Sequence, residues 1–325
     1  MPVVYKLVYL DYREILAILD VGKKNSRKNR MRAHWRGRIR HSDKMEKRSK
    51  KPDWLRVKAF SGAGFDRVSR LLKEQRLNTV CQAANCPNRG ECFNRGTATF
   101  LIMGSVCTRN CRFCDIEGGT PAPLDPEEPR RVADVVQVLG LKHAVITSVT
   151  RDDLQDGGAG HFAEVVRLIR EKTPDTTVEI LTPDFGGSSK AADTIIAAEP
   201  DVFNHNVETV LRLYATVRPQ ADYRRSLELL NYVSENSDIV TKSGLMVGLG
   251  ESIDELNQLF MDLAHSNVSI LTIGQYLAPS RSHLPVVRYV TPEEFDGLGR
   301  TARDAGIEKV FSAPLVRSSY KADLL

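Results

Sequence analysis

The six cysteines of this 325-residue chain all lie within 34 consecutive positions, from 81 to 114. They form two triplets, which are Cys81, Cys86 and Cys92 followed by Cys107, Cys111 and Cys114. A disulfide-stabilised secreted domain is usually short and distributes its cysteines so that bridges join distant segments. The clustering in this chain instead indicates thiolates that bind metal in a reducing compartment.

The second triplet has the spacing C-x3-C-x2-C and follows a short apolar run. Three thiolates this close together can enclose one cubic iron–sulfur cluster, which four thiolates normally complete. The missing fourth ligand leaves one iron open to bind another molecule. Arg109 and Arg112 lie between these cysteines, and we expect their positive charge to offset the charge of an anionic cluster.

The first triplet has the spacing C-x4-C-x5-C and is incomplete in the same way. Zinc is the alternative metal, because it takes nitrogen and sulfur ligands in closed four-coordinate sites. The six cysteines can serve one zinc with four ligands, or two zincs with help from His143 or His161. Paired C-x2-C knuckles are absent, since Cys111 and Cys114 form the only such pair. The spacing therefore favours iron–sulfur clusters over zinc, and disulfides are the remaining alternative.

From position 99 onward, short apolar runs alternate with helix-like stretches. The predicted strands are 99–103, 144–149, 178–181, 202–206, 243–247 and 270–276. The predicted helices between them are 129–139, 161–172, 191–198, 223–234 and 252–265. This alternation indicates an α/β fold with a parallel sheet. No Gly-x-Gly-x-x-Gly turn follows the first strand, as it would in a dinucleotide-binding sheet. The alternation therefore favours a full or partial barrel, with its chemistry at the carboxyl ends of the strands.

Composition and charge exclude several classes of protein. Hydrophobic residues make up 42% of the chain and charged residues 27%, as in ordinary globular proteins. No stretch approaches the ~20 apolar residues that a membrane-spanning helix needs. The net charge of +5 is unevenly distributed, because residues 1–50 carry +10 and the other 275 residues carry −5. We therefore expect a soluble, cytoplasmic protein whose folded part binds neither nucleic acid nor membranes.

The basic segment 1–50 has several interpretations. Residues 1–22 can form a short amphipathic helix, and residues 23–50 hold 13 basic residues against two acidic ones. Such a run is usually a solvated, disordered arm and less often a contact for nucleic acid or an acidic partner. A transit peptide and a start codon chosen upstream of the true one, at Met31 or Met45, are further alternatives.

Several motifs together carry a family resemblance. The second triplet, with Phe113 just before its last cysteine, resembles the signature of the radical S-adenosylmethionine superfamily. The first triplet and the Arg-Ser-Ser-Tyr string at 317–320 narrow the resemblance to the lipoyl synthase family. Segments of the expected type are 147–153, 203–206, 244–251 and 275–285. The resemblance runs from about residue 51 to residue 325, and the order of the two triplets and the terminal string makes it very specific.

The resemblance implies that Cys107, Cys111 and Cys114 hold a 4Fe–4S cluster, with Phe113 beside the cofactor. The open iron of that cluster would bind the amino and carboxylate groups of S-adenosylmethionine. One electron then cleaves this cofactor to methionine and a 5′-deoxyadenosyl radical, which is strong enough to take hydrogen from an unactivated carbon. The resemblance implies that the substrate is a protein-bound octanoyl chain. Acid–base catalysis could not act at the far end of this chain, because no acidic C–H bond lies there.

The resemblance also implies an auxiliary 4Fe–4S cluster, held by Cys81, Cys86 and Cys92, that donates sulfur and is consumed. Its fourth ligand in the family is the second serine of the terminal string, which is Ser319 in this chain. A serine oxygen is a harder ligand for iron than a thiolate and is more weakly held. This weaker bond suits an iron that has to leave when the cluster is dismantled.

Four polar residues after the predicted strands are candidates for binding S-adenosylmethionine. Ser148 and Arg151, at the end of the second strand, suit its carboxylate or its ribose. Asn204 and Asn206, past the fourth strand, can hydrogen-bond the nucleoside. The glycine-containing segment 244–251 suits a close approach of the backbone to adenine, and a plain strand-to-helix turn explains it equally well.

The implied architecture is a partial (β/α)6 TIM-type barrel at 99–290, preceded by an auxiliary-cluster segment at 51–98 and closed by a C-terminal segment at 291–325. The implied reaction inserts sulfur at carbons 6 and 8 of an octanoyl chain, which is amide-linked to a lysine of a lipoyl carrier domain. The implied carriers are acyltransferase components of 2-oxoacid dehydrogenases and the glycine cleavage H protein. A reducing electron donor and an iron–sulfur carrier that rebuilds the spent cluster complete the implied partners.

Two rival interpretations remain open from the sequence. Another radical enzyme with an auxiliary cluster would cleave S-adenosylmethionine but leave an octanoylated carrier unchanged. A zinc-stabilised nucleic-acid-binding protein would be colourless and would bind nucleic acid through its basic arm with a steep dependence on salt.

Overall fold

The computed structural model describes residues 50–57, 61–320 and 322. The expected helix within residues 1–22 and the expected disordered arm up to residue 49 therefore lie outside the described residues. The unit that spans Lys51–Leu325 contains both cysteine triplets and the predicted strands. Among the described residues, no helix combines the length and apolar character needed to cross a membrane.

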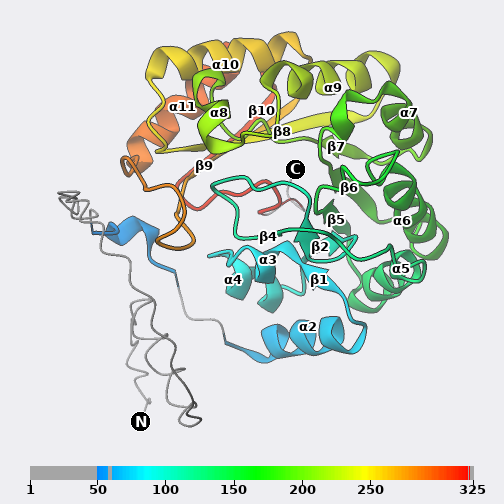
Figure 1. The fold of residues 1–325 in the computed structure, drawn as a ribbon. Coiled ribbons are helices and arrows are strands. Elements are labelled where there is room, and N and C mark those ends of the chain that lie inside the picture. Colours follow the sequence, from blue (N-terminus) through cyan, green and yellow to red (C-terminus); the bar gives the residue numbers. More distant parts are fainter. Residues whose placement is uncertain (1–49, 58–60, 321, 323–325) are drawn as a thin grey trace, which may run out of the picture. The chain divides into compact units, whose positions relative to one another are not determined.

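An open, curved sheet of eight strands forms the centre of this unit (Figure 1). The strand order is β1-β2-β5-β6-β7-β8-β9-β10, and all neighbours are parallel except β1, which is antiparallel to β2. The bounds are β1 Asn78–Thr79, β2 Thr99–Ile102, β5 His143–Ser148, β6 Thr177–Leu181, β7 Val202–Asn204, β8 Val240–Val247, β9 Ile270–Gln275 and β10 Lys309–Ser312. Because β1 and β10 are the two edges of this sheet, the barrel is partial, as the sequence predicted.

All six predicted strands are present with small shifts at their ends, and they form the parallel part of the sheet from β2 to β9. The structure adds a seventh parallel strand, β10, which pairs with β9. A separate two-stranded sheet joins β3 (Val106–Cys107) to β4 (Glu117–Gly118). The barrel therefore extends one strand further than the six-strand prediction.

Helices surround the outer face of the curved sheet (Figure 1). The five predicted helices correspond to α5 Glu128–Leu139, α6 Ala159–Lys172, α7 Ser189–Ala197, α9 Tyr223–Asn236 and α10 Ile253–His265. The other helices were not predicted from the sequence. They are α2 Ala63–Glu74, α3 Val80–Ala83, α4 Arg89–Asn94, α8 Tyr214–Val217 and α11 Pro292–Asp304, together with the short 3-10 helices Asp53–Leu55, Phe185–Gly187 and Leu211–Leu213. The short helices α3 and α4 carry the first cysteine triplet.

Local sequence signals explain where several helices begin and end. A capping box starts α10, in which the Ser252 side chain accepts from the Glu255 amide and the Glu255 side chain accepts from the Ser252 amide. Thr291 and Glu294 make the same arrangement at the start of α11. Helix α5 ends at Gly140, whose φ of 63° is in the left-handed region that glycine tolerates best.

The two faces of the strands have different environments, because successive side chains point to opposite sides of a sheet. Ile146 of β5 and Ile180 of β6 are fully buried and pack in one core with Phe162 of α6. Residues of the opposite parity face the inside of the barrel, and several of these are polar. Glu179 of β6 and Lys242 of β8 are both fully buried.

A buried ion pair spans the inside of the barrel. Lys242 Nζ lies 2.8 and 2.9 Å from the two carboxylate oxygens of Glu179. Asn204 donates to Glu179 at 2.9 Å, and His143 Nε2 lies 3.2 Å from the second carboxylate oxygen. Burial alone would raise the pKa of Glu179, but Lys242 and these hydrogen bonds hold it below its ordinary value. The carboxylate therefore stays charged inside the protein.

Replacing the cation of this pair is expected to destabilise the fold. Lys242→Met should lower the free energy of unfolding by about 3–5 kcal/mol, because it leaves a buried charge without its counter-ion. Anaerobic urea unfolding followed by circular dichroism measures the change. The double variant with Glu179→Gln removes the unpaired charge and should be less destabilised than Lys242→Met alone. A double variant that loses as much stability as the single one would contradict this explanation.

Candidate active site

The second cysteine triplet lies on a loop at the carboxyl end of the sheet. Cys107 ends β3, and Cys111 and Cys114 follow before β4 begins. The Cys107 sulfur accepts a hydrogen bond from the Thr150 amide, 3.3 Å away, just past β5. His283 Nε2 lies 3.0 Å from the Cys114 carbonyl oxygen and comes from the segment after β9. The loop is thus attached to both sides of the barrel at the end where barrel active sites lie.

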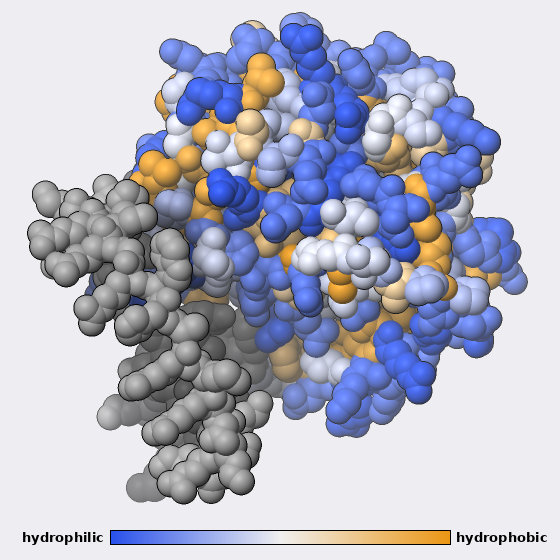
Figure 2. Space-filling model, viewed as in Figure 1, coloured by the Kyte–Doolittle hydropathy of each residue, from blue (hydrophilic) through white to orange (hydrophobic). Residues whose placement is uncertain are grey.

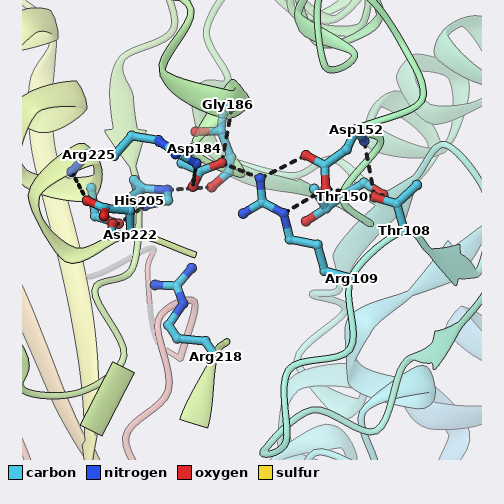
Figure 3. A network of polar contacts seen from close by, with 12 residues as sticks. Thr108, Arg109, Thr150, Asp152, Asp184, Gly186, His205, Arg218, Asp222 and Arg225 are labelled. Atoms are coloured by element: carbon cyan, nitrogen blue, oxygen red, sulfur yellow. Dashed lines mark hydrogen bonds and ion pairs between the residues drawn. The ribbon is translucent and has the colours of Figure 1, made fainter. Parts of the chain in front are cut away.

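Arg109 attaches this loop to the barrel by hydrogen bonds (Figure 3). Its guanidinium donates two hydrogen bonds of 2.8 Å to Asp152 and one of 2.6 Å to Asp184. Burial opposes the charge of Asp184, but Arg109 holds its pKa at about 2. Arg109 also acts against the rise in the pKa of Cys111. Its expected role in offsetting the charge of a cluster stays a prediction, and two carboxylates already pair with the guanidinium.

A different arginine, which the sequence analysis missed, brings positive charge to the cysteine loop. Arg218 is 8% exposed, and its guanidinium carbon lies 5.2 Å from the centre of the Tyr214 ring. Its Nη1 donates to the Asn206 carbonyl oxygen at 2.7 Å, and its buried Nε has no hydrogen-bond partner among the described residues. Burial raises the pKa of Cys111, and Arg218 acts against that rise. No sequence motif marks Arg218, since its neighbours come from distant segments.

Burial disfavours the ionised form of two thiols of the loop, those of Cys111 and Cys114. Burial and the neighbouring cysteines raise the pKa of Cys114 to about 12, and burial raises that of Cys111 as well. A bound metal deprotonates a coordinating thiol outright. A three-thiol set on one loop fits a cluster that keeps one iron open, in agreement with the spacing.

The first cysteine triplet lines a separate pocket. Cys81 lies on α3, Cys92 on α4, and Cys86 in the turn between the two helices. Ser319 lines the same pocket, together with Arg317. Burial raises the pKa of Cys81 to about 11 and that of Cys92 to about 12, with the neighbouring cysteines adding to the rise. Three thiols and one hydroxyl around one pocket fit a four-ligand cluster, and they join positions more than 200 residues apart.

The C-terminal segment reaches this pocket by passing through the partial barrel (Figure 1). A Cβ atom at Gly274 of β9 would collide with the Val316 carbonyl oxygen, so only glycine leaves room for the segment at that point. A Cβ at Gly244 of β8 would lie 2.9 Å from Ser318 Oγ and 2.7 Å from Asn206 Oδ1. These side chains take the space beside Gly244 itself. The expected approach of the segment 244–251 to adenine stays a prediction.

Hydrogen bonds attach the C-terminal segment to the first-triplet segment. Asn88 donates to the Leu315 carbonyl oxygen at 2.7 Å. Tyr320 donates to Glu91 at 2.9 Å, and Thr99 donates to Ser319 at 2.8 Å. The C-terminal segment therefore closes on the pocket, as the resemblance implied.

Three of the residues expected to contact the cofactor have unused polar atoms. Ser148 Oγ, Arg151 Nη1 and Asn204 Oδ1 are buried and have no hydrogen-bond partner among the described residues. The other nitrogens of Arg151 donate to Asp153 at 2.8 and 2.7 Å, which orients the guanidinium. Ser148 ends β5 and Arg151 follows it, next to the Thr150 amide that contacts Cys107. Unsatisfied buried polar groups are rare in proteins and suit a site that a ligand completes.

Asn204 and the other expected cofactor contacts also have partners within the protein. Asn204 is fully buried and its amide nitrogen donates to Glu179, so the expected contact with a nucleoside is left to its Oδ1 and stays a prediction. Asn206 donates to Ser318 at 2.7 Å and to Glu208 at 3.0 Å. Phe113 packs in a small apolar cluster with Val217, Leu249 and Tyr276. Asn206 thus links the barrel to the C-terminal segment.

Glu208 is a further residue that the sequence analysis missed. Its backbone φ of 66° is in the left-handed region, which is strained for a residue other than glycine. Burial raises its pKa, and Arg218, Asn206 and Arg317 act against that rise. Arg317 also interacts electrostatically with Cys86. Glu208 therefore lies in a chain of charges between the two cysteine triplets, and nothing in its sequence surroundings indicates this.

Comparison with known proteins identifies the family. A family model described as the Radical SAM superfamily matches residues 101–263. The chain is 57% identical over 276 residues to a lipoyl synthase of Methylococcus capsulatus, covering 84% of this chain and 86% of that protein. It is 55% identical over 276 residues to a lipoyl synthase of Caldanaerobacter subterraneus, covering 85% of this chain and 96% of that protein. The chain belongs to the lipoyl synthase family.

Membership of the radical S-adenosylmethionine superfamily means that the protein uses S-adenosylmethionine together with a 4Fe–4S cluster. A comparison of structures agrees with the fold. HydG, a maturase of the FeFe-hydrogenase, matches with a TM-score of 0.51 at 13% identity, covering 81% of this chain and 78% of that one. At this identity the likeness concerns the fold alone, and it supports the partial barrel of this chain.

Removing the oriented guanidinium at the end of β5 is expected to weaken cofactor binding. Arg151→Met should raise the dissociation constant for S-adenosylmethionine about 10- to 100-fold, the usual cost of losing a hydrogen bond to a charged group. Equilibrium dialysis with cluster-loaded protein measures the constant. Arg167→Met, which breaks surface ion pairs on α6, is the matched control and should leave it unchanged. An unchanged constant in Arg151→Met would exclude this residue as a cofactor contact.

Proposed function

We propose that the protein converts an octanoyl group into a lipoyl group by inserting sulfur at carbons 6 and 8. The octanoyl chain is carried in amide linkage on a lysine of a lipoyl carrier domain. Membership of the lipoyl synthase family supports the reaction. The observation that carries the proposal is the pocket of the first triplet. There three thiols and the Ser319 hydroxyl lie apart from the Cys107 loop.

In this proposal the two cysteine sets have different tasks. Cys107, Cys111 and Cys114 hold the cluster at which S-adenosylmethionine binds, and Arg109 keeps their loop in place through Asp152 and Asp184. When bound, the cluster and S-adenosylmethionine supply one-electron cleavage of the sulfonium, which yields a radical able to remove hydrogen from an unactivated carbon. Each removed hydrogen ends in 5′-deoxyadenosine, so two sulfur insertions use two molecules of S-adenosylmethionine and two electrons.

The pocket of the first triplet holds the auxiliary cluster that supplies the sulfur. Cys81, Cys86 and Cys92 provide thiolates, and Ser319 provides an oxygen ligand. Because oxygen is a harder ligand than sulfur, its bond to iron is the weakest of the four. Ser319 lies on the C-terminal segment, whereas the thiols lie on two short helices and the turn between them. The oxygen ligand and the thiolate ligands of the cluster would thus come from different parts of the chain.

The remaining residues of the site orient S-adenosylmethionine and shield the inside of the barrel from water. Ser148 and Arg151 offer unpaired polar atoms for the polar groups of S-adenosylmethionine. The C-terminal segment lies inside the barrel, against Gly244 of β8 and Gly274 of β9. It excludes water from that part of the barrel. Exclusion of water protects a reactive radical from side reactions.

Partners and compartment follow from the same reaction. We infer that the substrates are octanoylated lipoyl domains, either acyltransferase components of 2-oxoacid dehydrogenases or the glycine cleavage H protein. A reducing electron donor supplies the electrons, and an iron–sulfur carrier rebuilds the spent cluster. All six cysteines are free thiols, which suits the reducing cytoplasm, where disulfides are rare.

The direct test supplies an octanoylated carrier domain to anaerobically reconstituted protein with S-adenosylmethionine and dithionite. Mass spectrometry should show replacement of two hydrogens by two sulfurs on the carrier lysine, and chromatography should show about two molecules of 5′-deoxyadenosine per product. A carrier that stays octanoylated while S-adenosylmethionine is cleaved would favour a radical enzyme with another substrate. A protein that neither cleaves S-adenosylmethionine nor contains sulfide would exclude the proposal.

A further inference from the structure

Thr99 contacts two of the groups that we propose as ligands of the auxiliary cluster. It is the first residue of β2, and it is 5% exposed. Its hydroxyl donates to Ser319 Oγ at 2.8 Å. Its backbone also hydrogen-bonds the Cys81 thiol. Thr99 thus connects a thiol of the first triplet to the hydroxyl of Ser319, which lies 220 residues after Thr99 in the sequence.

The direction of the hydrogen bond determines what it can do. Because the Thr99 hydroxyl donates, Ser319 accepts through one lone pair of Oγ. A second lone pair of the same oxygen stays available for a metal in the pocket that both residues line. A hydrogen bond to an oxygen becomes stronger when that oxygen carries negative charge, as it does when it binds iron. The donor therefore favours the iron-bound form of the oxygen over the released form.

The two partners differ in how firmly they are held. Thr99 begins a strand that pairs with β1 on one side and β5 on the other. Ser319 lies beyond the last strand, in a turn near the end of the chain. A serine side chain has three staggered rotamers, and only a specific contact selects one of them. The hydrogen bond from Thr99 provides that contact.

We propose that Thr99 is a positioning residue that fixes Ser319 Oγ toward the pocket and favours the iron-bound form of this oxygen. The proposal rests on the proposed function, in which Ser319 is an iron ligand. Thr99 acts through Ser319. Loss of its hydroxyl then loosens the iron at the serine position, without removing any direct ligand.

The test measures how fast iron leaves the auxiliary site. The full-length chain carries Cys107→Ala, Cys111→Ala and Cys114→Ala, so that the remaining cluster belongs to the first triplet. Iron release to bathophenanthroline is followed anaerobically by absorbance. Thr99→Val keeps the shape of the side chain and removes the hydroxyl, and should speed release about tenfold or more, as expected for losing a hydrogen bond to a charged oxygen. Thr99→Ser keeps the hydroxyl and should release iron at a rate close to that of the parent.

A matched control separates the hydroxyl contact from a general loss of packing. Thr241 is a buried strand threonine in β8 whose hydroxyl donates to the Asn267 carbonyl oxygen. Thr241→Val should leave iron release unchanged. An unchanged rate in Thr99→Val, or an equal acceleration in Thr99→Ser, would overturn the proposal.

A double-mutant cycle with Ser319→Ala shows which contact matters. If Thr99 acts through Ser319, Thr99→Val should have no further effect in the Ser319→Ala background. A persisting acceleration there would place the effect at Cys81 and overturn the proposal. If Ser319→Ala itself leaves iron release unchanged, the ligand role of Ser319 fails. If Ser319→Ala speeds release and Thr99→Val does not, the inference about Thr99 fails alone.

Discussion

Replacing Cys107, Cys111 and Cys114 together with alanine is expected to abolish cleavage of S-adenosylmethionine while leaving the auxiliary cluster in place. The iron content should fall from about eight to about four per chain, because each 4Fe–4S cluster holds four irons. The reason is spatial, since the loop that carries these cysteines and the pocket of the first triplet are built from different elements. Formation of 5′-deoxyadenosine with dithionite measures the cleavage.

The opposite result would show that the two triplets are not independent. A variant that loses all its iron would indicate one shared metal site rather than two. A variant that still cleaves S-adenosylmethionine would exclude the loop as the radical site. Circular dichroism of the variant serves as the control for folding, because α3, α4 and the sheet do not depend on these three thiols.

Replacing Cys81, Cys86 and Cys92 with alanine is expected to produce the reciprocal effect. The variant should still form 5′-deoxyadenosine but should attach no sulfur to an octanoylated carrier, because the sulfur donor is missing. Mass spectrometry of the carrier, together with chromatography of the nucleoside, measures both outcomes in one reaction. A sulfur-containing carrier produced by this variant would contradict the role of the first triplet as the donor site.

The two serines of the terminal string give a finer version of the same prediction. Ser319→Ala removes the hydroxyl that lines the pocket, whereas Ser318→Ala removes one that hydrogen-bonds Asn206. We expect Ser319→Ala to lower the yield of lipoyl product about 10- to 100-fold. Removing a group that only supports a metal ligand already has an effect of this size, and Ser319 is proposed as a ligand itself. Ser318→Ala is the matched neighbour and should lose less. Equal losses would indicate that the two serines act only by holding the segment in place.

Much of the fold could be predicted from the sequence, because its strands are short apolar runs between amphipathic helices. The strand β10 was missed because Lys309–Ser312 is only partly buried and lacks an apolar run. Helix α11 was missed although Thr291 and Glu294 form a capping box at its start. Two glycines inside the helix, Gly297 and Gly299, weaken its helical signal in the sequence.

The candidate site was predictable where ligands are close together in the sequence. The spacing of each cysteine triplet is visible directly, whereas Ser319 was found only through the family resemblance. The partners of Arg109 and the position of Glu208 depend on contacts between distant segments, which periodicity does not reveal. The surroundings of Arg109 and Gly244 could not be predicted for the same reason, since they are formed by side chains from other elements.

The iron, sulfide and zinc content of anaerobically purified and reconstituted protein tests the central claim most directly. The claim is that the two triplets hold two separate iron–sulfur clusters. It predicts about eight irons and eight acid-labile sulfides per chain, and no stoichiometric zinc. Zinc without sulfide would contradict the radical mechanism and return attention to the zinc-stabilised alternative with its basic arm.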